Sequence, residues 1–302
     1  MFLKSKLKNW FLLILLIFLF FLPSTKIFAE NQIDTNRLDL LINETRRVEE
    51  KIKSLQNLIF QLQLQKTISA EAYLVVNLNN QSILLEKNKE KLYPIASITK
   101  LMSAVVAKEN IDLNQTIKLT EEMLKPEGYS PSLFSGLIIS AKNLLQASLI
   151  QSTNDAANSL TYFLEKEKFL ELMNKKAKEL SMTNTLFVDA HGLNPKNRST
   201  AEDLVKLLNY LYQFHQEILS ITKNNNFWLP NSTGRWLKFK NVNNFYKMPE
   251  FIGGKTGYLP EAKQTLAAIF NINNQPIAIV LLSSSNRQKD ALEIINWLKN
   301  QN

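Results

Sequence analysis

The stretch YPIASITKLMSAVVA, residues 93–107, decides how the chain folds around one polar pair. From Ile98 onward it is apolar on nearly every side of a helix, which predicts a buried central helix with Pro94 just ahead of its first turn. Residues three apart on a helix share a face, so the Ser97 hydroxyl should lie beside the Lys100 amine. The unpaired N–H groups of the helix start point the same way. One turn therefore offers a nucleophile, a base and an anion-stabilising donor.

Two other copies of the Ser-x-x-Lys pattern lie in different surroundings. Residues 5–8 belong to a basic N-terminal segment, and residues 220–223 run directly into three asparagines. Because the first copy lies in a basic leader and the second is followed by asparagines, we assign the chemistry to Ser97 and Lys100.

A second polar motif, Ser152-Thr153-Asn154, interrupts helical sequence. It follows the apolar residues 144–150, which predicts a junction between two helices whose polar groups face a cleft. An ordinary helix cap would also explain the motif, because serine and asparagine are common at that position.

The third motif is Lys255-Thr256-Gly257. Three of the chain's seven glycines fall within residues 253–257, and apolar residues flank them on both sides. Such crowding predicts a strand along which another backbone comes close. A loop is the alternative.

In this order, the three motifs resemble those of the penicillin-binding serine D,D-peptidases, and the resemblance is to the low-molecular-mass D-alanyl-D-alanine carboxypeptidases of peptidase family S11. The resemblance covers residues 67–302. Besides the motifs, it rests on an opening hairpin, on a segment that precedes a helix, and on a closing helix: residues 72–77 with 83–85, residues 184–193, and residues 290–297.

The resemblance implies catalysis through an acyl-enzyme. Ser97 attacks the carbonyl between two D-alanines, Lys100 accepts its proton, and Ser152 passes a proton to the leaving amine. Lys100 can act as a base only when it is unprotonated. Burial in an apolar helix and the nearby cation Lys255 should both lower its pKa.

The same resemblance implies the substrate contacts. Asn154 binds the substrate amide, and Lys255 with Thr256 holds the terminal carboxylate of a peptide that lies along the strand at Gly257. The oxyanion sits between two backbone N–H groups, that of the nucleophile and that of Tyr258.

The function implied is a serine D,D-carboxypeptidase that removes the terminal D-alanine from peptidoglycan stem peptides and is covalently inhibited by β-lactams. A D,D-endopeptidase that cleaves cross-linked stems uses the same residues and is the first alternative. A non-catalytic, anchored scaffold protein is the second. No Glu-x-x-Leu-Asn string occurs between residues 155 and 254, which argues against a β-lactamase that deacylates with a glutamate.

The composition further narrows the classes of protein to which the chain could belong. The 302 residues include two His and no Cys, so we expect no zinc site, no other metal or cofactor, and no disulfide framework. A net charge of +9 suits a protein near anionic wall polymers or lipid headgroups. The basic residues form no stripe with interleaved aromatics, so nucleic acid is not an expected partner. The oligomeric state stays open.

Residues 1–29 predict export. Three lysines precede an apolar run whose length suits a secretory signal better than a membrane span. Cleavage after Ala29 would release a secreted protein. Retention would leave an anchor, with the remainder on the outer face of the cytoplasmic membrane. Either outcome places the protein outside the cytoplasm.

Residues 30–66 predict an amphipathic helix, because residues 31–66 contain no Gly or Pro. Its apolar residues recur every seven positions, at Leu41, Val48, Leu55 and Leu62, with Ile52 and Ile59 alongside. A coiled-coil dimer is one interpretation, although several companion positions are polar. A single helical stalk, or a helix packed against the following domain, is the other.

The expected architecture is an α/β (α+β) fold of the β-lactamase/D,D-peptidase type in residues 67–302. It has an antiparallel sheet of about five strands, made by the early hairpin and by strands near residues 251–282. The terminal helix and a mostly helical subdomain, residues 96–220, flank this sheet, and the site lies where the sheet meets the helices.

Overall fold

A computed structural model describes residues 35–126, 133–230 and 236–300 of the chain. The export segment predicted for residues 1–29 lies outside these ranges. In the part of the chain that is described, no helix has both the length and the hydrophobicity to cross a membrane. The chain divides into two units, Met1–Ile59 and Phe60–Asn302.

The described helices include one of 33 residues and several shorter ones. They are α2 (Thr35–Thr67), α3 (Thr99–Asn110), α4 (Ala141–Ile150), α5 (Asn154–Thr161), α6 (Lys166–Glu179), α7 (Ala201–Phe214), α8 (Gln216–Lys223) and α9 (Arg287–Lys299), with 3₁₀ turns η1 (Ala96–Ile98) and η2 (Asn244–Lys247).

The described strands form one large sheet and three small two-stranded sheets. The large sheet holds β1 (Ala72–Asn77), β2 (Ile83–Lys87), β9 (Phe251–Leu259), β10 (Lys263–Ile272) and β11 (Gln275–Ser284). The pairs are β3 (Tyr93–Pro94) with β6 (Arg198–Ser199), β4 (Thr116–Lys118) with β5 (Ile138–Ser140), and β7 (Asn226–Pro230) with β8 (Trp236–Lys240).

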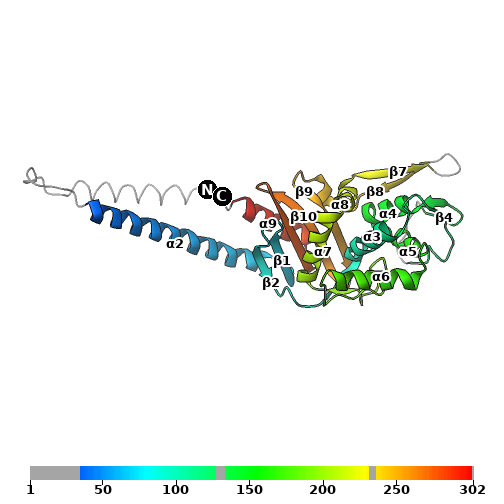
Figure 1. Ribbon diagram of the computed structural model, residues 1–302, viewed down its shortest axis with the longest axis horizontal. Helices are drawn as coiled ribbons and strands as arrows, with labels where there is room; N and C mark the ends of the chain where they lie inside the picture. Colours follow the sequence, from blue (N-terminus) through cyan, green and yellow to red (C-terminus); the bar gives the residue numbers. More distant parts are fainter. Residues whose placement is uncertain (1–34, 127–132, 231–235, 301–302) are drawn as a thin grey trace, which may run out of the picture. The chain divides into compact units, whose positions relative to one another are not determined.

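The large sheet confirms the predicted five antiparallel strands, in the order β2-β1-β11-β10-β9 (Figure 1). The early hairpin pairs with the last strand, because Ala72 of β1 lies opposite Leu282 of β11. Strand β9 lies at the edge of the sheet, with Lys255 opposite Ala267 of β10. The two ends of the domain must therefore meet before the complete sheet can form.

Both faces of this sheet are covered, because side chains alternate between the two faces along each strand. On one face, Val75 and Leu281 join a core with α9, the terminal helix that was predicted to flank the sheet. On the other face, Leu74 and Val280 join a larger core with α7 and the helices near α3.

Helix α3 is the buried central helix predicted from the sequence. Every residue from Thr99 to Ala107 is buried, and α4, α5, α6 and α8 pack around it. Its beginning differs in one detail: Ser97 lies in the 3₁₀ turn η1, and α3 starts at Thr99. Ala96 takes a left-handed backbone conformation with a φ of 49°, which sets the turn that leads into the helix.

The pair β7–β8 was not predicted. Its strands are short, and Phe227 stacks on Phe239 across the pair with ring centroids 4.8 Å apart. An aromatic cross-strand contact of this kind stabilises such a pair but has no signature in the order of the residues.

The helix predicted for residues 30–66 is observed as α2 from Thr35 onward, and its C-terminal end belongs to the core of the second unit. Leu64 is only 7% exposed and joins the same core as Ile68 and Trp297 of α9. The predicted domain boundary at residue 67 stays a prediction.

We predict that Leu64→Ala lowers the free energy of unfolding by about 2–3 kcal/mol, because it removes a buried side chain and leaves a cavity. The matched control is Gln65→Ala at the exposed neighbouring position, which should change stability by less than about 0.5 kcal/mol. Urea unfolding of both variants measures the difference. Equal effects would contradict a stabilising role for the end of α2.

Candidate active site

Lys100 lies among residues of the first two sequence motifs, and its amine is completely buried. Its Nζ is 2.9 Å from Ser97 Oγ, 2.8 Å from Asn154 Oδ1 and 2.6 Å from the His191 carbonyl oxygen. The side-chain amide oxygen and the backbone carbonyl can only accept hydrogen bonds. A neutral amine has two N–H groups, so donating both of them there leaves its lone pair for the Ser97 hydroxyl.

Ser152 lies in the predicted junction between two helices, since α4 ends at Ile150 and α5 begins at Asn154. Its backbone is left-handed, with a φ of 60°. Lys255 Nζ donates hydrogen bonds to Ser152 Oγ at 2.8 Å and to the Thr256 carbonyl oxygen at 3.0 Å. The three sequence motifs therefore meet at one place.

The third motif lies on strand β9, so the strand prediction is confirmed and the loop alternative is wrong. The predicted close approach of a backbone is also present. A Cβ atom on Gly257 would lie 2.9 Å from the Ser97 backbone nitrogen and 2.6 Å from Thr265 Oγ1. Glycine is therefore required because the turn that carries Ser97 packs against β9. Tyr258, the next residue, is 64% exposed, so its side chain points away from this contact.

Burial lowers the pKa of both site lysines. The pKa of Lys100 falls to about 7, because the effect of burial is larger than the opposing effect of the nearby Asp189 carboxylate. The pKa of Lys255 lies well below its usual range, first because of burial and then because of the positive charges of Lys100 and Arg287. Protonating both buried amines at once would place like charges in a poorly solvated space.

Asp189 was not among the site residues predicted from the sequence. Its carboxylate accepts hydrogen bonds from the backbone N–H of His191 at 3.0 Å, from that of Asn194 at 2.8 Å, and from Asn197 Nδ2 at 2.7 Å. These bonds hold the loop whose His191 carbonyl contacts Lys100. The contact between His191 and the lysine is made by the backbone oxygen, which agrees with a structural role for this residue.

Two further residues beside the site were not predicted from the sequence. Gly192 has a φ of 86°, and a Cβ there would lie 2.0 Å from the Ala96 carbonyl oxygen, so its loop packs tightly on the turn that carries Ser97. Arg287, the first residue of α9, donates from Nη1 to the Gly257 carbonyl oxygen at 2.8 Å. Arg287 belongs to none of the three motifs, so only the fold brings it beside β9.

A cleft of about 700 Å³ opens beside these residues. Its wall includes His191 and the residues that follow Tyr258 at the end of β9, and it carries charges of both signs. The lining residues are Lys166, Val188, Asp189, His191, Leu193, Asn194, Pro195, Leu259, Pro260 and Glu261.

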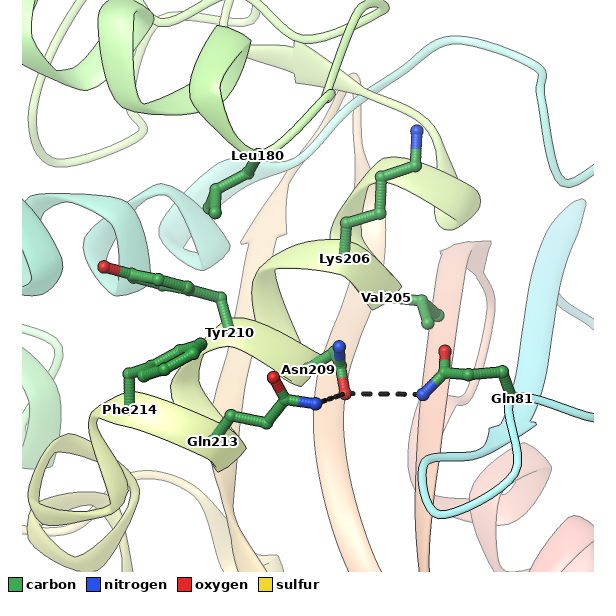
Figure 2. A pocket seen from close by; sticks show the side chains of 8 residues that line it. All are labelled: Gln81, Leu180, Val205, Lys206, Asn209, Tyr210, Gln213 and Phe214. Atoms are coloured by element: carbon green, nitrogen blue, oxygen red, sulfur yellow. Dashed lines mark hydrogen bonds between the residues drawn. The ribbon is translucent and has the colours of Figure 1, made fainter.

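A smaller pocket of about 240 Å³ lies on α7, where Asn209 accepts hydrogen bonds from Gln81 and Gln213 (Figure 2). Tyr210 and Phe214 form its apolar side. The predicted site residues line neither this pocket nor the larger cleft. We place the candidate active site beside the larger cleft, because its wall includes His191, whose carbonyl oxygen contacts Lys100.

Comparison with known proteins gives one family. The family model of peptidase S11, D-alanyl-D-alanine carboxypeptidase, matches residues 60–286. A D-alanyl-D-alanine endopeptidase of Pseudomonas aeruginosa is 33% identical over 79% of this chain and 80% of its own. A D-alanyl-D-alanine endopeptidase of Escherichia coli is 32% identical over 78% of this chain and 79% of its own.

Solved structures of similar proteins have the same fold. The crystal structure of a D-alanyl-D-alanine carboxypeptidase from Mycobacterium tuberculosis is 26% identical, with a TM-score of 0.71 over 76% of this chain and 90% of that one. Penicillin-binding protein D2 from Listeria monocytogenes, in its cefotaxime-bound form, is 27% identical, with a TM-score of 0.66 over 76% of this chain and 97% of that one.

We predict that the Lys100 amine titrates with a midpoint near pH 7, charged below it and neutral above it, because burial disfavours the charged form. NMR of the protein labelled with ¹³C at lysine Cε measures this, and Lys100→Met identifies the signal by its loss. A midpoint near the ordinary 10.5 would contradict the buried, water-poor site.

Proposed function

Since the chain belongs to the S11 family of serine-type D,D-peptidases, which act on cell-wall peptidoglycan outside the cytoplasm, we propose that Ser97 is its nucleophile. The observation that carries this proposal is the hydrogen-bonding pattern of Lys100. Two acceptors, on Asn154 and His191, take the N–H groups of the neutral amine. Its lone pair is then directed at the Ser97 hydroxyl, 2.9 Å away, which is the geometry of a general base.

Acylation follows from these contacts. Ser97 Oγ attacks the carbonyl carbon of the D-alanine as its proton moves to Lys100 Nζ. The backbone N–H groups of Ser97 and Tyr258 bind the oxyanion, and the closeness of Ser97 to β9 supports this pairing. Lys100 then returns this proton through the Ser152 hydroxyl to the leaving amine, so that Lys100 is neutral again, while Lys255 holds Ser152 by a hydrogen bond. In the second step water attacks the ester as Lys100 takes its proton, and this proton passes to Ser97 Oγ, which leaves as the free hydroxyl.

Substrate recognition also sets the protonation states of the two lysines. We place the carboxylate next to the scissile bond at Lys255 and Thr256, with Asn154 binding the substrate amide. Arg287 adds positive charge on the same side, since it lowers the pKa of Lys255. A bound carboxylate favours protonated Lys255, and this new charge favours loss of the proton from Lys100. Substrate binding therefore helps to generate the base.

For the bond that is cleaved, we propose D,D-endopeptidase activity on cross-linked stems. The two endopeptidases at 33% and 32% identity support it, because they match most of both chains. The cleft of about 700 Å³ supports it too, because a cross-linked substrate needs room for a second peptide. These findings favour the first alternative over carboxypeptidase activity, which was the leading prediction from the sequence.

Carboxypeptidase activity is the second candidate. The 26% identical carboxypeptidase structure supports it, and the two activities require the same nucleophile, base and carboxylate site. A β-lactam should acylate Ser97 in either case, a proposal that the cefotaxime-bound relative supports. The scaffold alternative is disfavoured, because an inactive protein has no need to bury two lysines beside two serines.

We predict that Ser97→Ala abolishes acylation by a fluorescent penicillin and that Lys100→Ala slows it by roughly 10²–10⁴-fold, the usual contribution of a general base. Lys223→Ala is the matched control, because this exposed lysine ends the duplicate Ser-Ile-Thr-Lys in α8. Mass spectrometry locates the label, and retained labelling in Ser97→Ala would refute the assignment. In the wild type, the acylation rate should rise with pH and level off above about 7, as neutral Lys100 accumulates.

We further predict that purified cross-linked muropeptide dimers are cleaved to monomers faster than a pentapeptide monomer loses its terminal D-alanine. Chromatography of the products, under one set of conditions, measures both rates. Ser97→Ala should abolish both rates, which assigns them to one site. Faster trimming of the monomer would make this protein a carboxypeptidase.

A further inference from the structure

Helix α2 presents a regular apolar seam along one side. Its members repeat in a seven-residue pattern, with one set of positions called a and the other called d. The a positions are Leu38, Thr45, Ile52 and Ile59, and the d positions are Leu41, Val48, Leu55 and Leu62. The seven apolar members of this seam are all exposed by about half of their surface. Within the described residues, nothing covers them.

The catalytic unit uses a different side of the same helix. Leu62 is 51% exposed, whereas Leu64, two residues later, is 7% exposed in the core with α9. Two residues correspond to a turn of about 200° around a helix, so the buried residue points away from the seam. At the end of α2, therefore, the side chain that enters the core lies on the opposite side of the helix from the seam residue Leu62.

We propose that the seam is the dimerisation surface of this protein and that it pairs in a parallel coiled coil with α2 of a second copy. Ile52 and Ile59 at a positions, with Leu55 and Leu62 at d positions, are the combination that favours parallel two-stranded coils. The seam from Leu38 to Leu62 is about 36 Å long. Covering it on both helices would bury on the order of 1,000 Å², the area that a specific interface requires.

Charges flanking the seam favour pairing near its C-terminal half. In a parallel pair, Glu44 of one helix faces Glu49 of the other, and like charges there weaken the N-terminal half. Lys51 faces the neutral Gln56, so no such repulsion arises next to Ile52 and the later seam residues. The single polar seam residue, Thr45, also lies in the weaker half.

A membrane surface is a poorer fit to the same helix. Helices that lie on membranes carry a polar face rich in lysine and arginine. The polar side of α2 instead mixes the two signs, with Arg46, Arg47 and Lys53 beside Glu49 and Glu50. Mixed charge suits a helix that stays in water and pairs with another protein helix.

Disulfide cross-linking of the full chain tests the proposal, because the chain contains no cysteine. In a parallel coil, equivalent d positions face each other, so Leu55→Cys should form a dimer under mild oxidation on a non-reducing gel. Lys53→Cys is the matched control on the outer side and should remain monomeric. If the Leu55→Cys variant cross-links no more than the Lys53→Cys variant, the proposal is overturned; a dimer with antiparallel helices would give this result.

Sedimentation of the full chain in mild detergent gives an independent measurement. The wild type should have twice the mass of one chain, the double variant Ile52→Asp with Leu55→Asp should have the mass of one, and Lys53→Asp should remain a dimer. All three should hydrolyse a short acyl-D-Ala-D-Ala peptide or bind fluorescent penicillin equally, which excludes unfolding as the cause. A monomeric wild type, or a dimer that survives both aspartates, would overturn the proposal.

Discussion

The burial of two lysine amines in one poorly solvated site is the constraint on which the rest of the structure depends. Lys100 and Lys255 are both almost entirely inaccessible, and each contacts a serine hydroxyl. Burial of an ammonium group is costly, so the pKa of each lysine falls. In an ordinary core this cost would only destabilise the fold. Here it makes a neutral Lys100 amine available near pH 7, and a neutral amine can accept the proton of a serine hydroxyl.

The surrounding elements satisfy this constraint by bringing backbones unusually close. Gly257 lets β9 approach the Ser97 turn, and Gly192 lets the Asp189 loop approach the same turn from another side. In each case a single Cβ atom would collide with backbone atoms. The Asp189 carboxylate holds its loop by four backbone or amide donors, which places the His191 carbonyl where the Lys100 amine can donate. Catalytic geometry is thus a result of packing between three segments distant in sequence.

The two units of the chain suit different tasks. The catalytic unit contains all the residues that we assign to peptide cleavage, and a cleft of about 700 Å³ lies beside them. Helix α2 contributes Leu64 to the core of that unit and leaves its seam available. A paired helix would present two cleavage sites to one polymer, which is useful for an enzyme whose substrate is a network rather than a free peptide.

The sequence alone determined the local features, because each of them depends on neighbouring residues. The helix that follows Ser97, the helix junction at Ser152 and the strand at Lys255 followed from periodicity and glycine crowding, whereas the five-stranded sheet, which joins distant strands, followed only from the family resemblance. The parts that it missed are contacts between distant segments. Asp189 and Arg287 belong to no short motif, and the pKa of Lys100 depends on how completely α3 is enclosed. Only the tertiary structure decided these, since burial and the close approach of charges exist only after the chain has folded.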